Sequence, residues 1–336
     1  MQPLTPDTSV RMRAAEGRRL WPLSGSPVLT VSAPPFAHSG QTVRSMMLTS
    51  IAALAPAMVM AGVVHGLPAV RVLAMCGVAA MIAEALCERL MGRASSLDDW
   101  HGLYTGLVFA FLLPASAPWW LALVGSAASI VLGKMIFGGL GGGPFSPALV
   151  GWAVCLLSWP EAIDPEFSML ASELTSPLHH LKFFGAEAVQ DVTPAQLLLG
   201  RQLGGLGASQ VWAVLAGGLA MVALGRVRWE IPLAFLAGLA GTAAIYWASD
   251  PSVHASPLFH LLAGSGAFVA FFAATDEPSS PSRPLPMLLF GLLAGALTVV
   301  IRVYGIYPDG APFAVLLANL FTPALARLRP KPFGAR

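Results

Sequence analysis

Four side chains with acid–base chemistry lie within strongly apolar stretches of the sequence. They are Glu84, Lys134, His260 and Arg302. An ionised group is costly in hydrocarbon, so a residue of this kind is by default a candidate for an ion pathway or a binding site. Glu84, Lys134 and Arg302 also lie near the ends of their stretches, where a long side chain can extend to the polar surface of a membrane. We favour this second explanation for all three and keep the first open.

Two histidines and three carboxylates are weaker candidates. The adjacent pair His179-His180 has the ring nitrogens of a metal site, but no third ligand follows at helical spacing, so a solvated pair in a loop is preferred. Asp276-Glu277 follows one apolar stretch, and Asp309 precedes another. Such residues commonly end or begin helices, and their place beside interrupted stretches leaves a role in an ion pathway open. The sequence predicts no metal site.

The short motifs that mark soluble enzymes are missing from the sequence. There is no HExxH, no Walker loop and no GxSxG in a strand–turn–helix context, and the glycine run does not match the GxGxxG of a dinucleotide site. We therefore predict no catalytic residue, no NAD site and no nucleic-acid partner for this chain.

The composition places these candidates in a membrane domain. Of 336 residues, 56% are hydrophobic and 11% are charged, whereas soluble domains have about 25% charged residues. The three cysteines lie in apolar stretches and are odd in number, which predicts free buried thiols rather than a disulfide framework. Residues 1–44 are polar and basic and show no apolar region typical of a cleaved signal peptide.

A run of five glycines and two prolines, Gly138 to Pro147, separates two of the apolar stretches. Inside a helix Gly costs about 1 kcal/mol and Pro about 3 kcal/mol, so the run predicts a break. Backbone groups freed at membrane depth must be satisfied by protein or by water in a cavity. Interrupted helices often form binding sites in membrane proteins, and we expect a site near this break.

The second half of the chain repeats parts of the first. Pro312-Phe313 follows Pro144-Phe145 at an offset of 168 residues, and the stretch that starts at His260 echoes the one that starts at His101. This pattern predicts an internal duplication, although chance similarity between glycine-rich apolar stretches would look alike. Paired repeats with interrupted helices commonly enclose a site near the bilayer midplane.

Ten apolar stretches are candidates for membrane crossing, since about 20 apolar residues span a bilayer. If all ten cross and the N-terminus is cytoplasmic, fifteen of the 19 Lys and Arg residues fall on the cytoplasmic side. The positive-inside rule supports this topology and places both termini in the cytoplasm. The stretches are 46–65, 69–88, 102–117, 119–137, 147–160, 208–225, 231–248, 257–274, 285–304 and 311–326.

This topology divides the chain into five parts. A cytoplasmic tail (1–44) is followed by a first membrane repeat (45–160), an acidic extracytoplasmic loop (161–207), a second membrane repeat (208–326) and a cytoplasmic tail (327–336). A connection as long as 161–207 is usually functional or disordered. A plain linker between two repeats would need far fewer residues, so the length of this loop needs a reason.

Five motifs together resemble a known family. They are Ala-Pro-Trp-Trp (117–120), Gly-Gly-Leu-Gly-x-x-Pro-Phe-x-Pro-Ala (138–148), Arg-Trp-x-Ile-Pro-Leu-x-Phe (228–235), His-Leu-Leu-x-Gly (260–264) and Gly-x-Tyr-Pro-Asp-Gly-x-x-Phe-Ala-Val-Leu-Leu-Ala-Asn (305–319). They resemble the D subunit of the Rnf electron-transport complex, which is similar to the B subunit of the sodium-translocating NADH:quinone reductase. The resemblance runs from about Pro34 to Pro323.

The resemblance implies an all-α polytopic fold of about ten transmembrane helices in two inverted five-helix repeats, like that of urea channels. It also implies a role within a complex of membrane and peripheral subunits in a bacterial inner membrane. That complex couples electron transfer between NADH and ferredoxin to Na⁺ or H⁺ translocation. We expect this chain to be inactive by itself and to contact membrane lipid.

The family further implies FMN joined by a phosphoester to Thr in an external Ser-x-Ala-Thr-Pro-Leu motif, by a flavin transferase. The matching residues here read Glu173-Leu174-Thr175-Ser176-Pro177-Leu178, so Ser176 stands at the Thr position. A phosphoester needs only a hydroxyl on an extended segment, and the residue before a proline is biased to extended conformations. Ser176 is the expected acceptor and Thr175 the lesser candidate, while an unmodified Ser-Pro turn is the alternative. Noncovalent riboflavin is a further cofactor that the resemblance allows.

A second functional hypothesis is a channel-like transporter of a small solute or ion without a redox cofactor. The departures from the motif at 173–176 favour it, and the match at 305–319 favours the electron-transfer hypothesis. We prefer the electron-transfer hypothesis.

Overall fold

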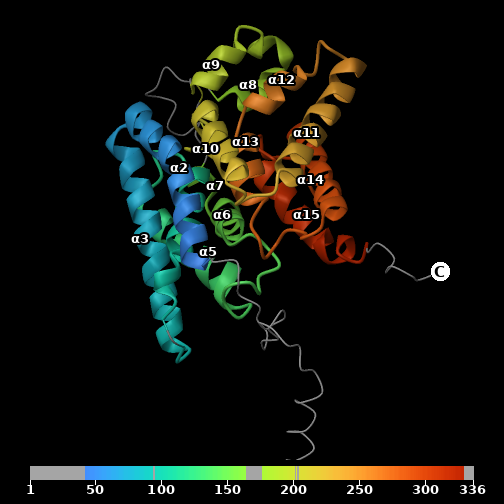
Figure 1. Ribbon diagram of the computed structural model, residues 1–336. Helices are drawn as coiled ribbons and strands as arrows, with labels where there is room; N and C mark the ends of the chain where they lie inside the picture. The colour runs from blue at the N-terminus through green and yellow to red at the C-terminus, as the bar shows by residue number, and fades with distance from the viewer. Residues whose placement is uncertain (1–41, 94, 164–175, 201, 203, 329–336) are drawn as a thin grey trace, which may run out of the picture. The chain divides into compact units, whose positions relative to one another are not determined.

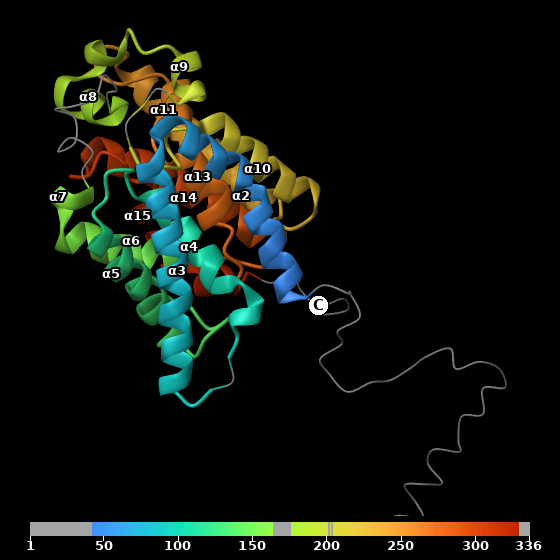
Figure 2. The same cartoon turned by 90° about the vertical axis from the view of Figure 1, so that its left-hand side faces the viewer.

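The computed structural model describes residues 42–93, 95–163, 176–200, 202 and 204–328, and these ranges contain helices and turns but no strand. Figures 1 and 2 show the helices from two directions. In chain order they are α2 (Val43–His65), α3 (Leu67–Leu90), η1 (Leu97–Asp99), α4 (His101–Leu112), α5 (Trp119–Ile130), η2 (Val131–Met135), α6 (Pro147–Ser158), α7 (Pro160–Ile163), α8 (Pro177–Phe184), η4 (Ala186–Val189), α9 (Pro194–Leu199), α10 (Val211–Ala223), α11 (Glu230–Ser249), α12 (Pro257–Leu262), α13 (Gly266–Phe268), η5 (Val269–Ala273), α14 (Pro284–Tyr304) and α15 (Ala311–Leu325).

Within these ranges, four helices are long and apolar enough to cross a membrane, namely α2, α3, α11 and α14. The chain is therefore a multi-pass membrane protein. Each of the ten apolar stretches predicted from the sequence contains at least one helix, but α4, α6, α10 and α15 have only 12 to 15 residues, and the stretch 257–274 is divided into α12, α13 and η5. The predicted loop 161–207 holds short helices of its own, α7 to α9.

The predicted break after residue 137 is confirmed. The helix formed by α5 ends in a π-helical turn, η2, and regular structure resumes only at Pro147, the first residue of α6. Between them Gly138, Gly139 and Gly141 have φ angles of 101°, 105° and 89°. Only glycine adopts such angles without strain, so the run of glycines is what lets the chain reverse here.

The second half is interrupted at two places. Between α12 and α13 the chain turns at Gly264, where φ is 74°, and between α14 and α15 it passes through the loop 305–310. The second interruption lies just before Pro312-Phe313, the pair that repeats Pro144-Phe145. The structure places its end at Gly310, because Pro312 occupies the first turn of α15, where proline is well tolerated.

Helices α11 and α14 pack closely against each other. Gly291 and Gly295 form a GxxxG pair on α14, and a side-chain carbon at either position would collide with backbone atoms of α11. Gly238 makes the same kind of approach from α11 to the backbone at Leu292. In a membrane, where helix association depends on dispersion contacts, small residues of this kind allow two backbones to meet.

Helices α8, α9 and α12 gather at one end of the membrane part, at the top of Figures 1 and 2. A small separate core joins them. It consists of Leu178, Val189, Leu197, Ala255, Phe259 and Ala263. Residues of the long connection are thus packed onto the membrane helices and form part of the fold.

Three stacked aromatic rings pack α4 against α13 and η5. Phe111 stacks on Phe268 with ring centroids 5.1 Å apart, and Phe268 stacks on Phe272 at 5.4 Å. The hydroxyl of Tyr104 donates to the Phe272 carbonyl oxygen at 3.2 Å. The three phenylalanines are buried and form part of the core where α4 meets α13 and η5.

Candidate functional site

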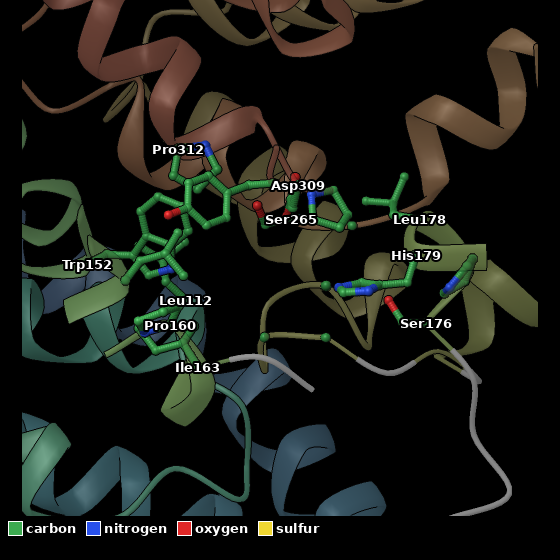
Figure 3. Close-up of a pocket in the computed structure, with 18 residues that line it drawn as sticks. Leu112, Trp152, Pro160, Ile163, Ser176, Leu178, His179, Ser265, Asp309 and Pro312 are labelled. Atoms are coloured by element: carbon green, nitrogen blue, oxygen red, sulfur yellow. Dashed lines mark hydrogen bonds between the residues drawn. The ribbon is translucent and has the colours of Figure 1, made fainter. Parts of the chain in front are cut away.

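A cavity with about 810 Å³ of empty space, part of it open to solvent, lies where the interrupted elements and the start of α8 meet (Figure 3). Its apolar wall comes from α6 and α7, and its polar side from the breaks at 264–265 and 307–309. We call it the outer cavity, after the predicted outer side of the 161–207 connection.

One wall of the outer cavity is aromatic and apolar. Trp152 and Tyr307 line it, and both rings pack against Phe313, with centroids 4.9 Å and 5.4 Å apart. Leu156 and Ile163 extend the apolar surface. Aromatic rings present flat faces to each other and to planar ligands, so this wall suits a planar heterocycle.

Ser176 lies on the opposite side of the same cavity (Figure 3). Its backbone has φ −88° and ψ 105°, the extended conformation predicted for a residue before proline. Ser176 precedes the first residue of α8, yet its side chain makes no capping hydrogen bond to that helix. The residue is only 4% exposed. Thr175, the lesser candidate, lies outside the described residues.

A buried arginine holds the two interruptions of the second half together. Arg302 donates to the carbonyl oxygens of His260 (2.6 Å) and Ala263 (2.9 Å), at the end of α12. It also pairs with the Asp309 carboxylate at 3.4 Å. Asp309 Oδ2 in turn accepts from the Ser265 amide at 2.7 Å. One side-chain pair therefore satisfies backbone groups freed by both breaks, as the burial of polar backbone groups requires.

Lys182 fastens α8 to the end of α14. Its ammonium donates to the Arg302 carbonyl oxygen at 3.3 Å and to that of Gly305. These oxygens lie at the C-terminal end of α14, where a cation also interacts favourably with the helix dipole. Burial lowers the pKa of Lys182. The segment that carries Ser176 is thereby held against a membrane-spanning helix.

We interpreted Glu84, Lys134 and Arg302 as side chains that extend to the membrane surface, and this interpretation is wrong. Glu84 and Lys134 form an ion pair with side-chain exposures of 2% and 3%, and the Arg302 side chain is 2% exposed. Each finds its counter-charge inside the protein, which removes the reason to reach the surface. The Glu84–Lys134 pair joins α3 to the π-helical turn that precedes the first break.

The remaining candidates are dispersed. His179 lines the outer cavity, while no group of three or more potential metal ligands occurs within the part of the chain that the structure describes. His260 is buried beside Phe259. Asp276 and Glu277 line a second cavity, with about 1070 Å³ of empty space, together with residues of α4 at the other end of that helix from the outer cavity.

Sequence reasoning missed the roles of Ser265 and Arg302 at the outer cavity. Ser265 is 4% exposed and lines the cavity, and its hydroxyl has no hydrogen-bond partner among the described residues. The signal available for Arg302 was Asp309, since an intramembrane cation normally has an acidic partner. No sequence pattern marks Ser265, because its isolation depends on the turn at Gly264.

Comparison with known proteins gives a consistent assignment. Residues 30–334 match the model of the family described as NQR2, RnfD, RnfE. The D subunit of the ion-translocating oxidoreductase complex of Yersinia enterocolitica is 33% identical over 346 residues, which cover 91% of this chain and 98% of the relative. The D subunit of the Na(+)-translocating ferredoxin:NAD(+) oxidoreductase complex of Acetobacterium woodii is 34% identical over 302 residues, with 89% and 93% covered.

A third relative is the D subunit of the ion-translocating oxidoreductase complex of Cronobacter sakazakii. It is 33% identical over 351 residues, which cover 92% of this chain and 100% of the relative. The matched range 30–334 includes every motif on which the resemblance was based. The chain therefore belongs to the NQR2, RnfD, RnfE family.

Proposed function

We propose that this chain is a membrane subunit of an Rnf-type ion-translocating oxidoreductase complex, and that it carries FMN on Ser176. The complex would couple electron transfer between NADH and ferredoxin to the movement of Na⁺ or H⁺. The family membership and the names of the relatives support the first part. The observation that carries the second part is that Ser176 lies on the wall of the outer cavity, beside both interruptions of the second half.

The residues of the outer cavity fit a flavin. Trp152, Tyr307 and Leu156 would hold the planar ring, and Ser176 supplies a hydroxyl that is not engaged in capping α8. A phosphoester formed there links the serine oxygen to the phosphate with loss of one water. When bound, FMN would supply electron-transfer chemistry, and the chain would supply its position beside the aromatic wall.

The burial of Ser176 has a consequence for attachment. A hydroxyl in a residue that is 4% exposed in the folded chain is poorly placed for attack by a separate enzyme. We infer that the flavin transferase acts before α8 packs against α14, so that attachment precedes the burial of Ser176. We also propose that the chain binds riboflavin noncovalently.

We also propose the architecture of ten crossings in two inverted repeats, with both termini in the cytoplasm of a bacterial cell and the chain in the inner membrane. Support comes from the helices found in all ten apolar stretches. It also comes from the π-helical turns η2 and η5, each beside an interruption in its half of the chain.

The competing hypothesis, a transporter without a redox cofactor, needs an open path through the centre. Phe111, the neighbour of the cavity-lining Leu112, is buried in a stack with Phe268 and Phe272. This observation favours the electron-transfer proposal, in which neither cavity has to pass a solute to the other.

Attachment can be tested on a denaturing gel. The chain expressed with its flavin transferase should fluoresce and gain the mass of one FMN less one water. Ser176→Ala should be dark and Thr175→Ala should remain fluorescent. If only Thr175→Ala is dark, the motif is displaced by one residue. A dark wild type that releases flavin on acid precipitation would indicate noncovalent binding, and one that releases none would support the transporter.

A further inference from the structure

We propose that Ser265 and Asp309 are the residues that recognise the polar edge of the flavin ring in the outer cavity. This inference rests on the proposed function and adds to it the orientation of the ring. Both residues line the cavity, and they lie at the two interruptions of the second half (Figure 3). The amide of Ser265 donates to Asp309 Oδ2 at 2.7 Å, so the two residues are held in a fixed relation.

Asp309 presents a carboxylate with unused acceptor capacity. Oδ2 accepts from the Ser265 amide, and Oδ1 accepts from Arg302 and from the Ala311 amide, both at 3.4 Å. A carboxylate has about four acceptor positions, so part of this capacity is free for a donor in the cavity. The side chain of Asp309 is 29% exposed, whereas that of Arg302 is 2% exposed. The arginine closes the protein side, and the carboxylate faces the cavity.

Asp309 and Ser265 together are called the recognition point below. The Ser265 hydroxyl is its second member. Buried hydroxyls on helices usually bond to the carbonyl oxygen one turn earlier, as Ser129 and Thr298 do here. Ser265 lies in the turn before α13, and its Oγ is buried without a partner among the described residues. Leaving such a group unsatisfied is unfavourable, because it has lost its hydrogen bonds to water. A ligand carbonyl in the outer cavity would remove that cost by accepting the hydroxyl proton.

The ligand that satisfies both groups must offer an N–H donor beside a carbonyl oxygen, at the edge of a flat and otherwise apolar body. An isoalloxazine has this pattern, because its N3–H lies between two carbonyl groups. Asp309 would accept from N3–H and Ser265 would donate to a neighbouring carbonyl. The aromatic wall formed by Trp152 and Tyr307 then faces the rest of the ring.

The two contacts predict opposite changes in one measurable property, the pH at which the oxidised ring loses its N3 proton. The Asp309 carboxylate favours the protonated ring, whereas a donor at the carbonyl favours the deprotonated ring. A hydrogen bond to a charged group is stronger than a neutral one, so Asp309→Asn should lower this midpoint by about one to two pH units. Ser265→Ala should raise it by about half to one unit, the equivalent of a neutral hydrogen bond.

The experiment is a pH titration of the flavin absorbance in the purified full-length chain. Ser126→Ala is the matched control, because it removes a buried hydroxyl on α5 that does not line the outer cavity. Its midpoint should equal that of the wild type. If Asp309→Asn fails to fold, because Arg302 loses its counter-charge, the sign of the Ser265→Ala shift still decides.

The outcomes separate the two proposals. Flavin fluorescence on the gel together with unshifted midpoints in both variants would overturn the recognition point and leave attachment at Ser176 intact. A shift of both variants in the same direction would also overturn it. A wild type that holds no flavin in any form would overturn the proposed flavin site and this inference together.

Discussion

Removal of the buried arginine should destabilise the chain more than any other single loss of charge near the outer cavity. Arg302→Met deletes two hydrogen bonds to carbonyl oxygens and the ion pair with Asp309. Breaking a buried pair in this way costs about 3–5 kcal/mol. At about 2 °C per kcal/mol for a long chain, the unfolding midpoint should fall by roughly 6–10 °C.

The free cysteines provide the assay. Cys76 and Cys155 are buried and form no disulfide. Their thiols become accessible when the chain unfolds in detergent, so a coumarin maleimide that fluoresces on reacting with thiols reports unfolding. Cys87 is partly exposed and is replaced by serine in all variants to lower the background. The control is Arg71→Met, because Arg71 is exposed and donates to one carbonyl oxygen, that of Ala117. A single bond of this type contributes about 1 kcal/mol, so this midpoint should move by about 2 °C.

Two further variants isolate the cause. Arg302→Lys keeps the charge but loses the planar fork that reaches three acceptors, so it should fall between the wild type and Arg302→Met. The double variant Arg302→Met, Asp309→Asn should lose less than the sum of the single losses, because it leaves no unpaired charge. If Arg302→Met has the same unfolding midpoint as Arg71→Met, Arg302 does not hold the two interruptions of the second half together.

Three other predictions follow from the topology, the subunit role and the helix packing. Cysteines introduced at Gly185 and Ser280 should react with impermeant labels from outside and from the cytoplasm, and labelling from one side would contradict the ten crossings. The chain purified alone should not oxidise NADH, since its sequence has no nucleotide motif and no cluster of cysteines, and NADH oxidation by the chain alone would refute the subunit role. When further membrane subunits are present, the chain should co-purify with them. Gly295→Ala should lower the unfolding midpoint by several degrees, because its new methyl group meets the α11 backbone. Gly241→Ala should leave the midpoint unchanged, because its methyl group would meet no atom of the described residues. Equal midpoints for the two variants would show that α11 and α14 are less closely packed than described.

The parts of the fold that depend on backbone freedom could be predicted from the sequence. The break at 138–147 follows from residue types alone, because glycine permits and proline enforces departures from a helix, and Gly138, Gly139 and Gly141 have the left-handed angles that this implies. The extended conformation of Ser176 follows in the same way from Pro177. These are local effects, and their causes are adjacent in the chain.

The pairing of charges could not be predicted in the same way. Glu84 meets Lys134 from 50 residues away, and Arg302 bonds to carbonyl oxygens 39 and 42 residues before it. A sequence shows that such groups are expensive in a membrane but does not show which partner removes the cost. Our preference for exposed side chains was therefore wrong for physical reasons that only the packing reveals. The Ser265 hydroxyl, which has no hydrogen-bond partner among the described residues, could not be singled out for the same reason.

The glycine-mediated contact between α11 and α14 also has a mechanical consequence. Two helices whose backbones touch at Gly238, Gly291 and Gly295 cannot slide or rotate against each other without a steric collision. They must move as one rigid body. We therefore expect any deformation during ion translocation to concentrate where the backbone has space. Gly138 and Gly141 are such positions, because an added side-chain carbon would meet no atom within 4 Å in the part of the chain that the structure describes. In this protein glycine makes one region stiff and another compliant, according to whether a neighbouring backbone is present.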